Sequence, residues 1–104
     1  FGFSLNTFAA RGSITATIDR LYSYSEQAGF DGDIAIEVST PLAGCEGGFW
    51  LRGADTIGYR NTVSILLSAF HAKTKIQFGA LTDQVWTGSS GAKFCRIDQV
   101  SLVR

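Results

Sequence analysis

The sequence predicts an α+β fold that is mainly β, with about six short strands and one amphipathic helix. Three observations support this fold class. Apolar residues alternate with polar ones in short stretches on both sides of a single stretch with helical spacing. The chain contains 12 glycines and one proline, which predicts many tight turns between short strands. Its 104 residues can build one hydrophobic core, so we expect residues 1–104 to form a single domain.

The first third of the chain predicts one strand after a short arm. Residues 1–10 hold three phenylalanines and a leucine at no regular spacing, which indicates an N-terminal arm or an edge strand. From residue 14, isoleucine and alanine alternate with threonine and aspartate, as is typical of a half-buried strand. The alternation slips by one residue before Tyr24, so we expect a bulge near Arg20. A turn should follow over residues 27–32.

Two further strands are predicted before the helix. In residues 34–38, isoleucine and valine alternate with alanine and glutamate, and the strand should end before Pro41, because proline donates no backbone hydrogen bond. We expect this strand to pair with the preceding one. After a glycine-rich turn around residues 44–48, residues 49–52 form a short third strand.

The period then changes to that of a helix over residues 59–72, where apolar residues recur at three- and four-residue spacing and polar residues occupy the other side. Asp55 or Thr56 is expected as the N-cap, and basic residues near the far end suit the helix dipole. Residues 75–81, 84–87 and 93–103 are then predicted as strands, with a hairpin loop over residues 88–91.

The two cysteines, Cys45 and Cys95, predict one disulfide bond that closes a long loop. An even count in a short chain with no Cys-x-x-Cys pair is typical of a structural disulfide rather than a metal or redox site. Closing a loop of about 50 residues would stabilise the fold by about 4 kcal/mol. We therefore expect a secreted or periplasmic protein. The alternative is a cytosolic domain with two buried free thiols.

The start of the sequence supports export. The chain contains no methionine and begins with Phe1-Gly2-Phe3, so we expect a mature form from which a signal peptide has been removed. The alternative is a chain that starts within a longer protein. No apolar run reaches the roughly 18 residues that span a bilayer, so we expect no transmembrane segment.

Composition and motifs argue against catalysis and against nucleic-acid binding. Nine basic residues balance nine acidic ones, which leaves no net field to attract nucleic acid. The one histidine, His71, falls on the polar side of the predicted helix and is expected to be solvated. No metal-ligand spacing, nucleophile motif or phosphate-binding glycine loop is present. We therefore expect no enzymatic activity, no metal and no cofactor.

The aromatic residues suggest binding. Trp86 lies in a polar segment, where a tryptophan can stack on the apolar face of a sugar while nearby hydroxyls and amides bond to its hydroxyl groups. The alternative is that Trp86 packs beneath a loop or at a subunit contact. Trp50 is expected in the core or in an interface, and Tyr22 and Tyr24 are typical of an interface.

The order of three strands, one helix and three strands resembles the B subunits of AB5 bacterial toxins, in particular the subtilase-cytotoxin and typhoid-toxin type. The similar segments run from about Arg11 to Val103. They are Gly12-Ser13-Ile14, Ile36-Glu37, the cysteine before the third strand, Leu66-Leu67-Ser68-Ala69-Phe70 and Lys75-Ile76-Gln77-Phe78. The resemblance implies a small Greek-key barrel of the oligonucleotide-binding (OB) type, a ring of five chains, and recognition of sialylated cell-surface glycans.

By this resemblance, Ser13 and Glu37 take the hydrogen-bonding positions of the glycan site. The aromatic position after the helix corresponds to Phe78, which lacks the hydroxyl group of a tyrosine. We expect Ser13, Glu37 and Trp86 to contact the glycan, the first two by hydrogen bonds and the third by stacking. The chain also has fewer cysteines than these relatives, so its disulfide pattern differs.

Taken with this resemblance, the sequence predicts a secreted or periplasmic lectin without chemistry of its own; the resemblance implies that it forms a pentameric ring and delivers a separate catalytic A subunit of a bacterial toxin. Five copies would combine weak sugar contacts into useful avidity. The alternative is an exported or periplasmic protein-interaction module, such as an inhibitor or an assembly component.

Overall fold

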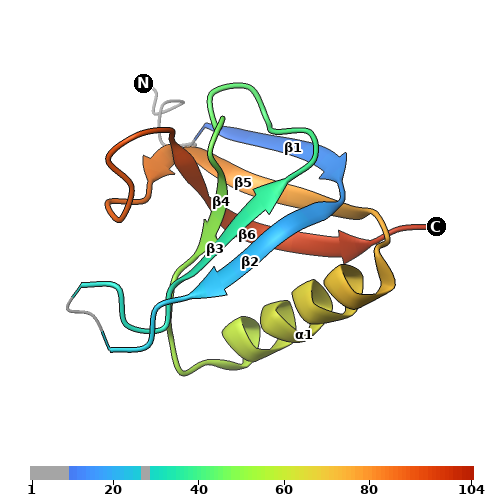
Figure 1. Cartoon of the computed structure of the whole chain (residues 1–104), viewed down its shortest axis with the longest axis horizontal. Helices are drawn as coiled ribbons and strands as arrows, with labels where there is room; N and C mark the ends of the chain where they lie inside the picture. Colours follow the sequence, from blue (N-terminus) through green and yellow to red (C-terminus); the bar gives the residue numbers. More distant parts are fainter. Residues whose placement is uncertain (1–9, 27–28) are drawn as a thin grey trace, which may run out of the picture.

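The structure, a computed structural model that describes residues 10–26 and 29–104, consists of a six-stranded mixed sheet and one helix (Figure 1). The predicted class, α+β and mainly β, is confirmed. In chain order the elements are β1 (Arg11–Ala16), β2 (Ile18–Ser23), β3 (Ile34–Val38), β4 (Gly48–Leu51), α1 (Ile57–Ala72), β5 (Ile76–Val85) and β6 (Phe94–Leu102).

The strand order requires the sheet to curl. The order is β1-β5-β6-β4-β3-β2, and all neighbours are antiparallel except β4 and β6, which run parallel. β1 and β2 stand at the two ends of this order, yet only Thr17 separates them in the chain. The ends of the sheet therefore meet at Thr17. Two hydrogen bonds hold this corner: the Thr17 amide donates to Oγ of Ser39 (3.1 Å), and the Ser39 amide donates to the Thr17 carbonyl (2.9 Å).

The first predicted strand is divided in the structure. The expectation of one strand from residue 14 to Tyr24 is wrong at Thr17, where the chain turns from β1 into β2. The bulge near Arg20 is confirmed by a register shift between Ile18 and Arg20, and so is the pairing of β2 with β3. The predicted arm, residues 1–10, lies outside the described residues except for Ala10, whose carbonyl accepts a hydrogen bond from the Thr82 amide (2.9 Å).

Two strands follow the helix where three were predicted. Residues 84–87 are not a separate strand, because β5 runs without a break from Ile76 to Val85. The polar residues Thr82 to Gln84 interrupt the hydrophobic alternation, but the backbone stays extended and instead shifts its register against β6 between Leu81 and Val85. The predicted loop at residues 88–91 lies between β5 and β6, as expected.

The helix begins two residues before the predicted start and is capped as the sequence indicated. Thr56 is the N-cap, and its Oγ1 accepts a hydrogen bond from the Tyr59 amide (3.1 Å). The helix ends at Ala72, and Lys73 adopts the left-handed conformation that terminates many helices (φ 54°). Leu66 and Ala69 are buried against the sheet.

The interior of the curled sheet holds the main hydrophobic core. Phe49 and Phe78 stack there with ring centroids 4.7 Å apart, and both are fully buried. The predicted disulfide is confirmed between Cys45 and Cys95, whose Cα atoms lie 5.6 Å apart and whose side chains are also fully buried. This bond joins the loop before β4 to β6.

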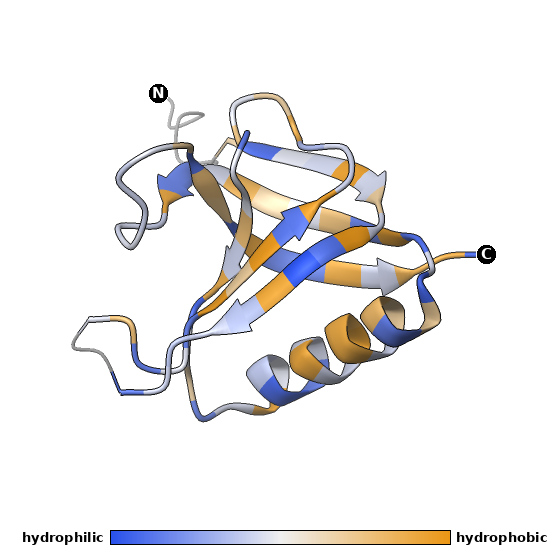
Figure 2. Ribbon diagram, in the orientation of Figure 1, coloured by the Kyte–Doolittle hydropathy of each residue, from blue (hydrophilic) through white to orange (hydrophobic). Residues whose placement is uncertain are grey.

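A second, smaller cluster lies on the outer face of the sheet. The alternation in β3 placed Ala35 on the polar side, but Ala35 is fully buried, because Trp86 and Phe94 pack with it. Figure 2 shows hydrophobic residues along much of β3, as expected for a strand covered on both faces. We call this group the outer aromatic cluster; its members are Ala35, Trp86 and Phe94, with Tyr22, Tyr24, Phe30 and Trp50 packed against them.

Replacing both Cys45 and Cys95 with alanine should lower the free energy of unfolding by about 4 kcal/mol, because the loop of 50 residues is no longer closed in the unfolded chain. Urea unfolding followed by circular dichroism measures this loss. The wild-type protein treated with a reductant serves as the control and should lose a similar amount. An unchanged unfolding midpoint in both samples would contradict the assigned role of the bond.

Candidate functional site

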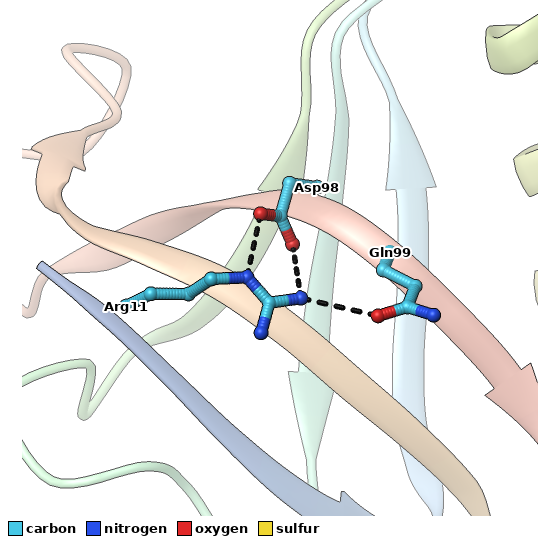
Figure 3. Close-up of polar contacts among 3 residues, drawn as sticks. All are labelled: Arg11, Asp98 and Gln99. Carbon is cyan, nitrogen blue, oxygen red and sulfur yellow. Dashed lines mark hydrogen bonds and ion pairs between the residues drawn. The ribbon is translucent and has the colours of Figure 1, made fainter. Parts of the chain in front are cut away.

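Ser13 lies in an exposed polar strip across three strands. It is exposed on β1, in register with Gly79 of β5. Arg11 reaches from the same strand across β5 to β6 (Figure 3). Its Nε donates to Oδ2 of Asp98 (2.8 Å), and its Nη2 donates to Oδ1 of Asp98 (3.0 Å) and to Oε1 of Gln99 (3.1 Å). The hydrogen bonds to Asp98, and then the charge of Asp98, raise the pKa of Arg11.

Gly79 makes this crossing possible. A Cβ atom at Gly79 would lie 2.3 Å from Nη2 of Arg11 and 3.0 Å from Oδ1 of Asp98, so any larger residue would displace the guanidinium. The ion pair is solvent-exposed and contributes little to stability. Its structural effect is to hold the outer strand β1 to β6.

Glu37 lies elsewhere, in an acidic cavity. It is partly exposed on β3, and its Oε2 lies 3.5 Å from Nη1 of Arg20 on β2. Glu37 lines a cavity of about 400 Å³ together with Asp19 and Glu46, and Ser13 is not among the lining residues. Three carboxylates in one cavity disfavour an anionic ligand there.

Trp86 is buried in the outer aromatic cluster. Its side chain is 3% exposed, and its ring makes edge-on contacts with Tyr24, Phe30 and Phe94 at centroid distances of 5.4, 5.9 and 5.5 Å. The structure thus agrees with the alternative in which Trp86 packs beneath a loop. The neighbours that cover it come from distant parts of the chain, which its polar sequence context does not reveal. Its contact with a glycan stays a prediction.

Phe78, which the resemblance placed in the glycan site, is fully buried in the interior of the sheet against Phe49. It alternates inward along β5, so its ring cannot reach a ligand on the outer face. The aromatic contribution to any site must therefore come from another residue.

The structure brings together a polar cavity that the sequence did not predict, which we call the Trp50 cavity. It has a volume of about 290 Å³, and three loops and the end of β4 contribute to it. Its lining residues are Gly29, Asp31, Asp33, Trp50, Arg52, Gly53, Trp86 and Thr87. Trp50 is partly exposed, and Arg52 is exposed two residues further along the chain. In an extended chain this i, i+2 spacing places two side chains on one face, and it was the only local signal, although β4 ends at Leu51 and Arg52 lies in the loop that follows.

The carboxylate of Asp33 fixes the floor of this cavity. Its side chain is buried, and each oxygen accepts one hydrogen bond: Oδ1 from the Gly53 amide (2.8 Å) and Oδ2 from Nε1 of Trp86 (3.0 Å). A Cβ atom at Gly53 would lie 2.1 Å from the carbonyl oxygen of Asp31, so glycine permits the close approach of the two loops. The loops are therefore held in one arrangement.

Charged groups surround Trp50. The guanidinium of Arg96 lies 6.0 Å from the centroid of the Trp50 ring and donates to Oε1 of Gln84 (3.0 Å). Nε1 of Trp50 donates weakly to the Gln84 carbonyl (3.5 Å). Within the described residues, Arg52 forms no ion pair. The cavity thus offers a tryptophan, an available guanidinium and two carboxylates.

His71 is exposed near the end of α1, as predicted. Across residues 10–26 and 29–104, no group of three or more histidine, cysteine, aspartate or glutamate side chains is arranged to hold a metal ion. The one helix in this part of the chain is too short and too polar to cross a membrane.

Comparison of the chain with protein-family models found no matching family, and comparisons with curated proteins and with solved structures found no match.

Replacing Asp33 with alanine should destabilise the protein by about 3 kcal/mol, because the Gly53 amide and the Trp86 indole both lose a charged acceptor. Urea unfolding measures the change. Asp31→Ala is the matched control, since it removes an exposed carboxylate from the same loop and should change stability by less than about 0.5 kcal/mol. Equal effects of the two variants would contradict the role given to Asp33.

The phenol of Tyr59 predicts a loss of stability at alkaline pH. Burial, and then the charge of Asp33, raises the pKa of Tyr59, whose hydroxyl donates to the Gly32 carbonyl (2.6 Å). A group whose pKa is higher in the folded state stabilises that state below its unfolded pKa, about 10, and this contribution is lost as pH rises further.

Unfolding free energies at pH 8 and pH 11 test this expectation. The wild type should lose more stability over this interval than Tyr59→Phe, which has no phenolic proton to release. Identical losses in the two proteins would show that Tyr59 is not responsible.

Proposed function

We propose that this protein is a glycan-binding module that acts outside the cytosol, as a ring-forming delivery subunit of a bacterial toxin. The observation that carries the proposal is the Trp50 cavity, in which an aromatic ring stands beside fixed acceptors and an available guanidinium. Sugar sites combine an apolar ring surface with a few precisely placed polar groups. Ser13, on its exposed strip, and Glu37, in its own cavity, remain proposed secondary contacts.

The topology supports an OB-type Greek-key barrel. If β1 and β2 are counted as one strand bent at Thr17, the sheet has five strands, which in chain order are β1–β2, β3, β4, β5 and β6. In space, the first strand is followed by the second, the third, the fifth and the fourth, and the fourth pairs again with the first. The helix then lies between the third and fourth strands, and the third and fifth run parallel. Such five-stranded barrels bind oligosaccharides or oligonucleotides on their outer surface and loops. The zero net charge favours a sugar over a nucleic acid.

Export is supported by the disulfide, because such bonds persist in oxidising compartments. We propose a pentameric ring on two grounds. The outward side of α1 carries the polar residues Arg60, Ser64, Ser68 and His71, which suit a water-filled centre. The outer edges of β1 and β2 have no partner strand in the described sheet and could pair with neighbouring chains. A separate catalytic A subunit would occupy one face of this ring.

One observation favours a second function, that of an exported protein-interaction module. An apolar groove of about 470 Å³ lies between β2 and α1, lined by residues that include Leu21, Tyr22, Val63 and Leu67. Ile57 and Leu67 on α1 are 69% and 44% exposed. Exposed apolar surface of this kind suits a protein partner, such as an inhibitor's target or an assembly component.

A glycan array and native mass spectrometry test the proposal together. We expect binding to a defined set of glycans, weakened by combined replacement Ser13→Ala and Glu37→Gln, and a particle five times the 11.2 kDa mass of one chain. Binding at one site should be near millimolar, so the array signal should depend on the ring. A monomer without glycan binding, which captures a protein independently of sugar, would overturn the proposal in favour of the second function.

A further inference from the structure

We infer that the Trp50 cavity binds a neutral pyranose unit, with Trp50 as the stacking surface. The inference rests on the proposed glycan-binding function and narrows it. It differs in two respects from the expectations drawn from the sequence: the tryptophan is Trp50 rather than Trp86, and the sugar is uncharged rather than sialylated.

The two tryptophans have different roles because their surroundings differ. Trp86 is 3% exposed and its Nε1 is bonded to Asp33, so it supports the cavity from below. Trp50 is partly exposed on β4 and lines the same cavity. Trp50 is the more exposed of the two tryptophans, and a pyranose ring presents an apolar face of C–H groups that can stack on an indole ring.

The size and rigidity of the cavity suit one sugar ring. Its volume of about 290 Å³ lies just below the range for drug-sized ligand sites, about 300–1,000 Å³. The loop contacts between Asp33, Gly53 and Trp86 fix the carboxylate of Asp33 before any ligand arrives. Fixed groups lower the entropic cost of binding.

The charges select against an acidic sugar. Asp31 and Asp33 contribute two carboxylates to the lining, whereas Arg52 contributes one guanidinium. Within the lining, a sugar carboxylate would therefore meet two like charges and one opposite charge; the guanidinium of Arg96 lies beside Trp50 outside the lining and already donates to Gln84. Sugar hydroxyls avoid this conflict, because they donate to carboxylate oxygens and accept from a guanidinium. Each oxygen of Asp33 uses one protein hydrogen bond and can accept another.

A cationic ligand fits less well. Trp50 and the two carboxylates would attract an ammonium group, but Arg52 lines the cavity and the guanidinium of Arg96 already lies 6.0 Å from the Trp50 ring. Neutral hydroxyl groups can hydrogen-bond to both the carboxylates and the guanidinium of the lining.

Nuclear magnetic resonance of the ¹⁵N-labelled protein tests the inference. The chain has two tryptophans, so its spectrum holds two indole N–H signals, and the Trp50→Phe variant assigns them. Methyl glycosides of glucose, galactose and mannose are titrated alongside the matching uronic acids, which differ by a carboxylate in place of the hydroxymethyl group. We expect at least one neutral glycoside to shift the Trp50 signal, with its uronic acid binding about tenfold more weakly.

Two variants sharpen the result. Arg52→Gln should weaken binding of the neutral glycoside about tenfold, because a charged hydrogen bond is lost. Arg60→Gln is the control, since Arg60 lies on α1, pairs with Asp55 and does not line the cavity; its affinity should match the wild type. Asp31→Asn should reduce the difference in binding affinity between each neutral sugar and its uronic acid. Neither arginine variant removes a buried group, so both are expected to fold.

The possible results test the neutral-sugar inference and the proposed glycan-binding function separately. Tighter binding of a uronic acid than of its neutral partner would overturn the neutral-sugar inference and leave glycan binding intact. Glycan-array binding without any shift of the Trp50 signal would overturn the location. No sugar binding in either experiment would overturn the proposed function itself.

Discussion

The parallel pairing of β4 with β6 is the junction on which the whole fold depends. It joins a half made of β1, β5 and β6 to a half made of β2, β3 and β4, and it comprises three residue pairs: Gly48 with Phe94, Phe49 with Cys95, and Trp50 with Arg96. So short a ladder would be weak alone, since parallel pairing is slightly less stable per residue than antiparallel pairing. The Cys45–Cys95 bond reinforces it from the interior, beside the stacked Phe49 and Phe78.

The same junction explains where the candidate site lies. The inner residues of the β4–β6 pairing belong to the main core, and its outer residues include Trp50 and Arg96 beside the cavity. Loops from both halves converge over this outer surface, and the buried carboxylate of Asp33 bonds one loop to Gly53 and another to Trp86. The site is thus built beside the disulfide-reinforced pairing of β4 with β6, and the hydrogen bonds to Asp33 fix its buried carboxylate.

The sequence predicted the features that neighbouring residues determine. The helix, its Thr56 cap, the bulge near Arg20 and the strands β3 and β4 follow from local spacing, and the cysteine count was enough for the disulfide. Burial of Trp86 and Ala35 was not predictable in this way, because the residues that cover them are distant in the chain. The Trp50 cavity was missed for the same reason: Asp31, Arg52 and Thr87 come from three separate loops and meet only after the sheet has curled.

The guanidinium of Arg11 occupies space that a side chain at position 79 would need, and its hydrogen bonds to Asp98 and Gln99 hold it there. Substitutions at positions 11, 79 and 98 are therefore coupled. Because Nη2 of Arg11 and Oδ1 of Asp98 both lie close to where a Cβ atom at position 79 would stand, a side chain there requires that Arg11 be replaced and that Asp98 shift or be replaced. In a set of related sequences, arginine at position 11 and glycine at position 79 should accordingly appear and disappear together, which offers a signature for finding distant homologues that share this edge of the sheet.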